Sequence, residues 1–175
     1  MATYKIDAAH SEIGFKIKHL VISTVSGNFS KFDAVMESEK PDFTDAKITF
    51  EADVHSVSTN SEQRDGHLKS DDFFHAEQYP KITFTSTSIE KKDDNEYVLY
   101  GDLTIRGITK NIALKAEHGG SAVDPWGQNK EGFEVTGKIS RKDFNLKWNA
   151  LTEAGGAVVG DDVRLVMNVQ MIKQA

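Results

Sequence analysis

The sequence predicts an all-β fold: a closed antiparallel barrel of about eight strands, with a short helical cap around residues 60–72. Several stretches alternate apolar and polar side chains, the period-two pattern of a strand with one dry and one wet face. Turn-forming residues separate these stretches, and long helical patterns are scarce. Residues 60–75 break the alternation and combine a polar run with a pair of phenylalanines.

Eight stretches are expected to form the strands of the barrel. The strongest alternation covers residues 13–17, 46–54, 97–105, 112–116, 133–139 and 163–171, and weaker alternation covers 27–36 and 81–87. Gly101 and Gly137 lie inside two of them, where glycine marks a bend or a close approach. A closed barrel leaves no free strand edge, and one of about eight strands can hold a small ligand.

Helix is expected mainly at residues 60–72. Thr59, Asn60 and Ser61 are candidate N-caps, and Glu62 would lie in the first turn. Phe73 and Phe74 follow, so this segment has the character of a cap with an apolar plug over the open end of a barrel. A single helical turn is also expected at residues 18–23.

The composition limits the partners and chemistry of the chain. Its 175 residues form one expected domain, 1–175, and its net charge of −6 argues against a nucleic-acid partner. No stretch is apolar enough to predict an integral membrane span. Since the first residues lack the basic and apolar regions of a secretory signal, we expect a cytoplasmic protein, or a periplasmic one if a signal has been removed.

The sequence predicts no metal site, cofactor or catalytic residue. Cysteine is absent, and the six histidines form neither an HxxxH nor an HExxH pair. The chain has no Gly-x-Ser-x-Gly nucleophile elbow. A binding protein is therefore expected rather than an enzyme.

Arg64 and His67 lie three residues apart and would share one face of the predicted helix. Two interpretations stay open: an ion pair of Arg64 with Asp65 or another group that holds the cap to a strand, or a polar rim that meets the head group of a ligand. The apolar strand faces are equally ambiguous, because they predict either a filled core or the wall of a cavity.

Several sequence blocks, spread from residue 4 to about 170, resemble the YceI-like family. They are Tyr4-x-Ile6-Asp7-x-x-His10-Ser11, Arg64-Asp65-x-His67-Leu68-x-Ser70-x-Asp72-Phe73-Phe74, Gly101-Asp102-Leu103-Thr104-Ile105-Arg106-Gly107, Arg141-x-Asp143-Phe144 and Val159-Gly160-Asp161-x-Val163. Asn145 departs from the family pattern, in which we expect glycine after the Asp-Phe pair.

The resemblance implies a lipocalin-like barrel with a long hydrophobic tunnel that binds a polyisoprenoid or similar amphipathic lipid, often as a homodimer. Family members are linked to stress, and many are periplasmic. We therefore expect a carrier, store or sequestering protein for such a lipid. Two alternatives stay open: an enzyme that acts on the bound lipid through His and Asp residues at the barrel mouth, and an interaction protein with a filled barrel.

The expected ligand-binding residues divide into two groups. The lipid tail would lie among Phe15, Ile17, Phe50, Phe84, Leu99, Leu103, Phe133 and Leu165. The head group would lie near His10, His19, Arg64, Asp65 and His67.

Overall fold

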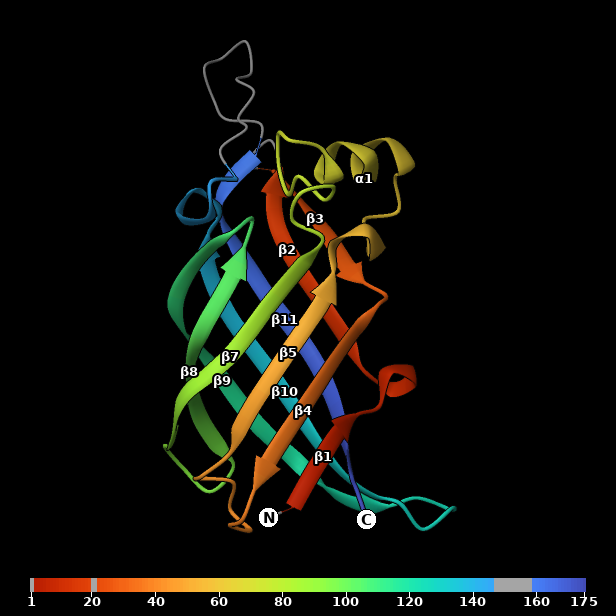
Figure 1. Cartoon of the computed structure of the whole chain (residues 1–175), viewed down its shortest axis with the longest axis vertical. Helices are drawn as coiled ribbons and strands as arrows, with labels where there is room; N and C mark the ends of the chain where they lie inside the picture. Colours follow the sequence, from red (N-terminus) through yellow and green to blue (C-terminus); the bar gives the residue numbers. More distant parts are fainter. Residues whose placement is uncertain (1, 20–21, 147–158) are drawn as a thin grey trace.

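Eight antiparallel strands close into a barrel (Figure 1) in the computed structural model, which describes residues 2–19, 22–146 and 159–175. The ring closes because β11 pairs with β10 on one side and with β1 on the other. In spatial order it comprises β1 (Ala2–Ile6), β4 (Phe32–Ser38), β5 (Lys47–Asp53), β7 (Lys81–Lys91), β8 (Glu96–Ile105), β9 (Ile108–Val123), β10 (Asn129–Ser140) and β11 (Val159–Lys173). The predicted fold class is confirmed.

Three more strands extend one wall of the barrel beyond β1. β2 (Glu12–His19) pairs with the first part of β11, β3 (Ser23–Phe29) pairs with β2, and the short β6 (Val57–Ser58) pairs with β3. A 3-10 turn, η1 (Ala8–His10), separates β1 from β2. Since β1 pairs with β4 and β2 pairs with β3, these four strands form one long, interrupted hairpin.

The prediction of a single strand over residues 27–36 is wrong, because the chain bends at Ser30 and Lys31 and divides it into β3 and β4. The backbone at the bend bonds outside the hairpin: Ser30 N–H donates to Ser56 O (3.3 Å), and Lys31 O accepts from Asp53 N–H (2.9 Å). The other predicted strands are present, most of them longer than expected. Alternation missed β1 and β6, which have five and two residues.

The helical turn expected at residues 18–23 is not found in the described part of that segment. Lys18 and His19 end β2, and Ser23 begins β3. Residues 20 and 21 lie outside the described residues. β2 and β3 are paired in register up to His19 and Ser23.

The cap consists of α1 (Glu62–Lys69) and the turns that follow it, up to residue 76. Ser61 is the N-cap, and its hydroxyl accepts from the backbone N–H of Arg64 (3.2 Å). The helix is shorter than the predicted 60–72 because Ser70 has an extended backbone, φ −77° and ψ 171°. Figure 1 shows α1 over one end of the barrel, which we call the mouth, and both chain ends at the opposite end, the floor.

A candidate ligand-binding cavity

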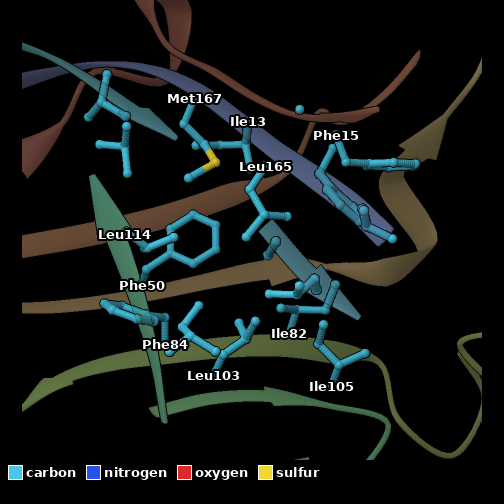
Figure 2. Close-up of a pocket in the computed structure, with 18 of the residues that line it drawn as sticks. Ile13, Phe15, Phe50, Ile82, Phe84, Leu103, Ile105, Leu114, Leu165 and Met167 are labelled. Carbon is cyan, nitrogen blue, oxygen red and sulfur yellow. The ribbon is translucent and has the colours of Figure 1, made fainter. Parts of the chain in front are cut away.

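The inward faces of the strands enclose a cavity of about 590 Å³. Figure 2 shows ten of its apolar side chains directed into the shared space from several strands, among them Phe15, Phe84 and Leu114. Well-packed protein interiors have few voids larger than a water molecule, so this barrel is hollow and its inward faces are not a filled core. The volume falls within the range of small-molecule sites, about 300–1,000 Å³.

All eight residues expected around a lipid tail lie on the cavity wall. Their inward orientation follows from the alternation along each strand, which puts every second side chain on one face. They are Phe15, Ile17, Phe50, Phe84, Leu99, Leu103, Phe133 and Leu165.

Phe43 closes the floor of the cavity. It lies in the loop between β4 and β5, is buried, and has a left-handed backbone with φ 61°. Its ring contacts those of Tyr4, His118 and Phe133, with centroids 5.9, 5.5 and 5.6 Å away. Phe43 also lines the cavity, so this ring is part of the wall that ends it.

Polar bonds hold the Phe43 loop in place. Asp45 accepts from Ser38 Oγ (2.7 Å) and from the backbone N–H groups of Glu39 (2.8 Å) and Lys40 (3.2 Å). These hydrogen bonds, that of Ser38 first, lower the pKa of Asp45 to about 2. Tyr97 Oη donates to the carbonyl of Asp42 (2.6 Å), which ties the same loop to β8.

Polar side chains enter the cavity lining at the mouth. Thr59, Ser61, Gln63, Arg64 and His67, from α1 and the residues before it, all belong to the lining. Two apolar rings of the cap, Phe73 and Phe74, line the same end of the cavity. The cavity is therefore apolar along its length with a polar end beneath α1.

Arg64 and Asp65 both bond to Thr59, which follows β6. Arg64 Nε donates to Thr59 Oγ1 (2.8 Å), and Arg64 Nη2 donates to Thr59 O (2.6 Å). Asp65 Oδ1 accepts from Thr59 N–H (2.8 Å) and from Thr59 Oγ1 (2.5 Å). Arg64 therefore attaches the cap to the segment after β6, as one of the two interpretations predicted. The attachment consists of hydrogen bonds to Thr59 and not of an ion pair. Arg64 also lines the cavity, whereas Asp65 is not among the lining residues that the structure describes.

The histidines expected at the head group lie in different places. His67 lines the cavity, with Nε2 2.8 Å from Asp72 Oδ2 and its ring edge-on to Phe73. His10 lies on η1, is 60% exposed, bonds to Asp7 and is not among the described lining residues. All of β2 separates it from the mouth (Figure 1), so it does not join Arg64 and His67. His19 ends β2, and its side chain lies outside the described residues.

Sequence reasoning missed two arginines that build the mouth. Arg106 lies in the two-residue turn between β8 and β9 with φ 50° and donates to Asp71 O (2.6 Å), Phe73 O (2.8 Å) and Asp71 Oδ1 (2.6 Å). It therefore fastens the cap to a β-hairpin. Its one signal was its place in a family block, immediately before a glycine in a turn.

Arg141 is the second arginine that was missed. It begins η3 (Arg141–Phe144), is 1% exposed and lines the cavity. Nε donates to Gly160 O (2.7 Å) and Nη1 to Leu146 O (2.6 Å). Burial lowers the pKa of this guanidinium, and nearby Asp161 opposes that shift.

The described residues contain no group of three or more His, Asp or Glu side chains placed to hold a metal ion. Nor does any helix in this part of the chain have the length and apolar character needed to cross a membrane.

Comparisons with known proteins agree with this architecture. Residues 4–171 match the family model of the YceI-like domain. Protein YceI of Escherichia coli O157:H7 is 41% identical over 175 residues, covering 99% of this chain and 88% of that protein. The crystal structure of the Campylobacter jejuni YCEI protein is 39% identical with a TM-score of 0.77, covering 97% of this chain and 96% of that one.

A more distant structure shares the fold alone. It is described as a polyisoprenoid binding domain from Saccharophagus degradans, and it has 14% identity, a TM-score of 0.70 and 98% coverage of both chains. The family resemblance read from the sequence blocks is confirmed by the closer matches. The chain belongs to the YceI-like domain family.

Proposed function

We propose that this protein binds a polyisoprenoid or similar long-chain amphipathic lipid, with the tail inside the barrel and the head group at the mouth. The observation that carries this proposal is a cavity of about 590 Å³ whose lining is apolar except at the mouth. The description of the Saccharophagus degradans domain, which shares the fold, supports the same ligand class.

Burial of the tail supplies the affinity in this proposal. Each CH₂ group removed from water contributes about 0.8 kcal/mol. A long chain therefore binds without specific polar contacts, and the cavity is expected to accept several tail structures. The eight apolar residues that were predicted from the sequence surround the tail, and Arg64 and His67 meet the head group. Asp65 acts through Thr59, by holding the cap in place.

Extraction of the purified protein with a denaturing solvent, followed by mass spectrometry, tests the proposal. We expect about one lipid per chain, and the stripped protein should take up an added polyprenyl alcohol with the same stoichiometry. A blank extraction combined with no uptake would contradict the proposal. Exposed Trp126 lies outside the cavity lining, so Trp126→Ala serves as a control variant whose uptake should equal that of the wild type.

The His67–Asp72 pair favours a second candidate function, an enzyme acting on the bound lipid. An imidazole within 2.8 Å of a carboxylate, on the cavity wall, has the geometry of a general base. The test is product formation from a prenyl diphosphate, lost in His67→Ala and kept in His55→Ala, whose side chain is exposed. We rank binding first because the sequence offers no nucleophile elbow and no cofactor fingerprint.

Transport, storage or sequestration of the lipid, a homodimer, and a cytoplasmic or periplasmic location stay predictions. Light scattering after gel filtration tests the homodimer, and cell fractionation tests the location.

A further inference from the structure

The charged side chains that line the cavity all have the same sign. Lys18, Arg64 and Arg141 belong to the lining, and no Asp or Glu does among the described residues. The whole chain has the opposite bias, with 27 acidic against 21 basic residues. The basic lining is therefore a local property of the cavity and not a reflection of composition.

Arg64 is held by neutral partners. Its two bonds to Thr59 end on a hydroxyl and a carbonyl oxygen, which fix the guanidinium without cancelling its charge. The third nitrogen, Nη1, makes no hydrogen bond to the described residues. Arg64 thus brings a fixed positive charge to the wall of the mouth.

Arg141 adds a second, more deeply buried charge. Two of its nitrogens donate to backbone carbonyls, and Nη2 lies 3.6 Å from Asp161 Oδ1. That carboxylate is 55% exposed and also lies 3.2 Å from Lys142 Nζ. Water and a second cation therefore weaken its effect on Arg141.

Lys18 lies beside Arg141 at the same rim. Arg141 bonds to the carbonyl of Gly160, and a Cβ placed on Gly160 would lie 3.3 Å from Lys18 Cβ. Lys18 is exposed, so its ammonium contributes less than the two guanidinium groups. Two acids of the cap face this end of the cavity. Asp65 accepts from the same Thr59 hydroxyl that binds Arg64 Nε, and Asp72 is 52% exposed and lies 2.8 Å from His67 Nε2.

We propose that the lipid bound here has an anionic head group, a phosphate or a carboxylate, which Arg64 selects at the mouth within a lining that Arg141 and Lys18 keep basic. This inference rests on the proposed lipid-binding function. Guanidinium groups match the geometry of carboxylate and phosphate oxygens, and attraction between opposite charges strengthens where water is excluded. A neutral alcohol gains less binding free energy at this site, and the positive charges of the lining repel an ammonium head group.

Three ligands with one tail test the proposal: geranylgeranyl phosphate, geranylgeraniol and geranylgeranylamine. Their affinities for the stripped full chain are measured by displacement of a fluorescent lipid probe at low and high salt. We expect the phosphate to bind at least about tenfold more tightly than the alcohol, and the amine to bind weakest. High salt should reduce the difference in affinity between the phosphate and the alcohol, and should leave the affinity for the alcohol unchanged.

Variants on α1 assign the preference to Arg64. Arg64→Met keeps an unbranched side chain and should reduce the phosphate-to-alcohol preference several-fold, while Arg64→Lys should retain most of it. Lys69→Met removes a positive charge from the same helix outside the cavity lining and should leave the preference unchanged. The ratio of the two affinities is the readout, because loss of the Thr59 bonds would affect both ligands alike.

The outcomes separate this inference from the function on which it rests. If geranylgeraniol binds as tightly as the phosphate, the head-group proposal is overturned and lipid binding stands. If none of the three ligands binds, both fail. Inorganic phosphate is the fourth arm: competition with the lipid probe at equal concentration would show a site for free anions, and would also overturn the proposal.

Discussion

The ring of Phe84 on β7 lies over Gly101 on β8, so closely that a Cβ placed on Gly101 would be 2.3 Å from Phe84 Cζ. Gly101 alternates with Leu99 and Leu103, so it faces the interior of the barrel. Leu114 lies over Gly137 in the same way, at 2.4 Å from a Cβ. At both positions the missing side chain leaves room for a large neighbour against the barrel wall, which keeps the interior open.

We predict that Gly101→Ala lowers both stability and lipid uptake. The added methyl group would force the ring of Phe84 away from the wall and into the cavity (Figure 2). Overpacking of this kind costs about 1–3 kcal/mol. Denaturant unfolding of the stripped protein measures the stability, and titration with a polyprenyl alcohol measures the uptake.

A double-mutant cycle with Phe84→Ala attributes the effect to this contact. Once the ring of Phe84 is removed, Gly101→Ala should lower the free energy of unfolding only a little. The effects of the two substitutions on that free energy should therefore be clearly non-additive. Gly66→Ala is the matched control, because a Cβ at this helical position meets nothing within 4 Å. It should stabilise the protein by about 0.5–1 kcal/mol. Equal losses from Gly101→Ala with and without the ring would refute the explanation.

Arg106→Met should loosen the cap. The substitution removes the three bonds to Asp71 and Phe73 while keeping an unbranched side chain at the same φ of 50°. Hydrogen bonds to charged groups contribute about 1.5–3 kcal/mol each at most, so local opening becomes more frequent. We expect faster hydrogen exchange over residues 70–76 and faster release of bound lipid, with a small change in global stability.

Lys110→Met is the control for the cap variant, because Lys110 is exposed on β9. The rates of hydrogen exchange and of lipid release in Lys110→Met should match those of the wild type. Release at the wild-type rate from Arg106→Met would show that the lipid leaves by another route.

Alternation predicted the fold because each strand of a closed barrel has one dry face. β8 illustrates this: every second residue from Tyr97 to Ile105 is buried or small, and all but Gly101 line the cavity. The same reasoning failed at residues 27–36, because the buried positions change parity at the bend, from Gly27 and Phe29 to Ala34 and Met36. The partners of the bend, Asp53 and Ser56, lie more than twenty residues away and have no local signal.

The candidate site was predicted unevenly for a related reason. Strand parity places a side chain inside or outside the barrel, which is why the eight apolar residues could be placed on the cavity wall from the sequence. The alternation along a strand carries no information about the end of the barrel at which a loop lies. His10 was therefore predicted to lie with Arg64 at the head group, although β2 separates them. Asn145 has φ 61°, a conformation that asparagine tolerates and glycine favours, so its departure from the family pattern leaves the turn intact.

The floor of the cavity should loosen in acid. Hydrogen bonds to the ionised carboxylate of Asp45 lower its pKa from 3.8 to about 2. A lowered pKa means that this carboxylate stabilises the folded loop above about pH 4, and that the contribution is lost as the pH falls toward 2. Wild type should therefore unfold at a higher temperature than Asp45→Asn at neutral pH, with the difference shrinking in acid. Asp94→Asn, at an exposed turn, serves as the control for the removal of one acidic charge.

Phe43→Ala should raise the longest tail that the protein accepts. Phe43 ends the cavity at the floor, and its removal opens the space that Tyr4, His118 and Phe133 surround. The change costs stability, about 3–5 kcal/mol, so binding is compared at a temperature where the variant is folded. With polyprenyl alcohols of increasing length, affinity for the wild type should rise and then stop rising once the tail reaches Phe43, while the variant should continue to gain. Phe50→Ala widens the cavity on its side wall and should change affinity without moving that limit. An unchanged limit in Phe43→Ala would show that the tail ends before it reaches the floor.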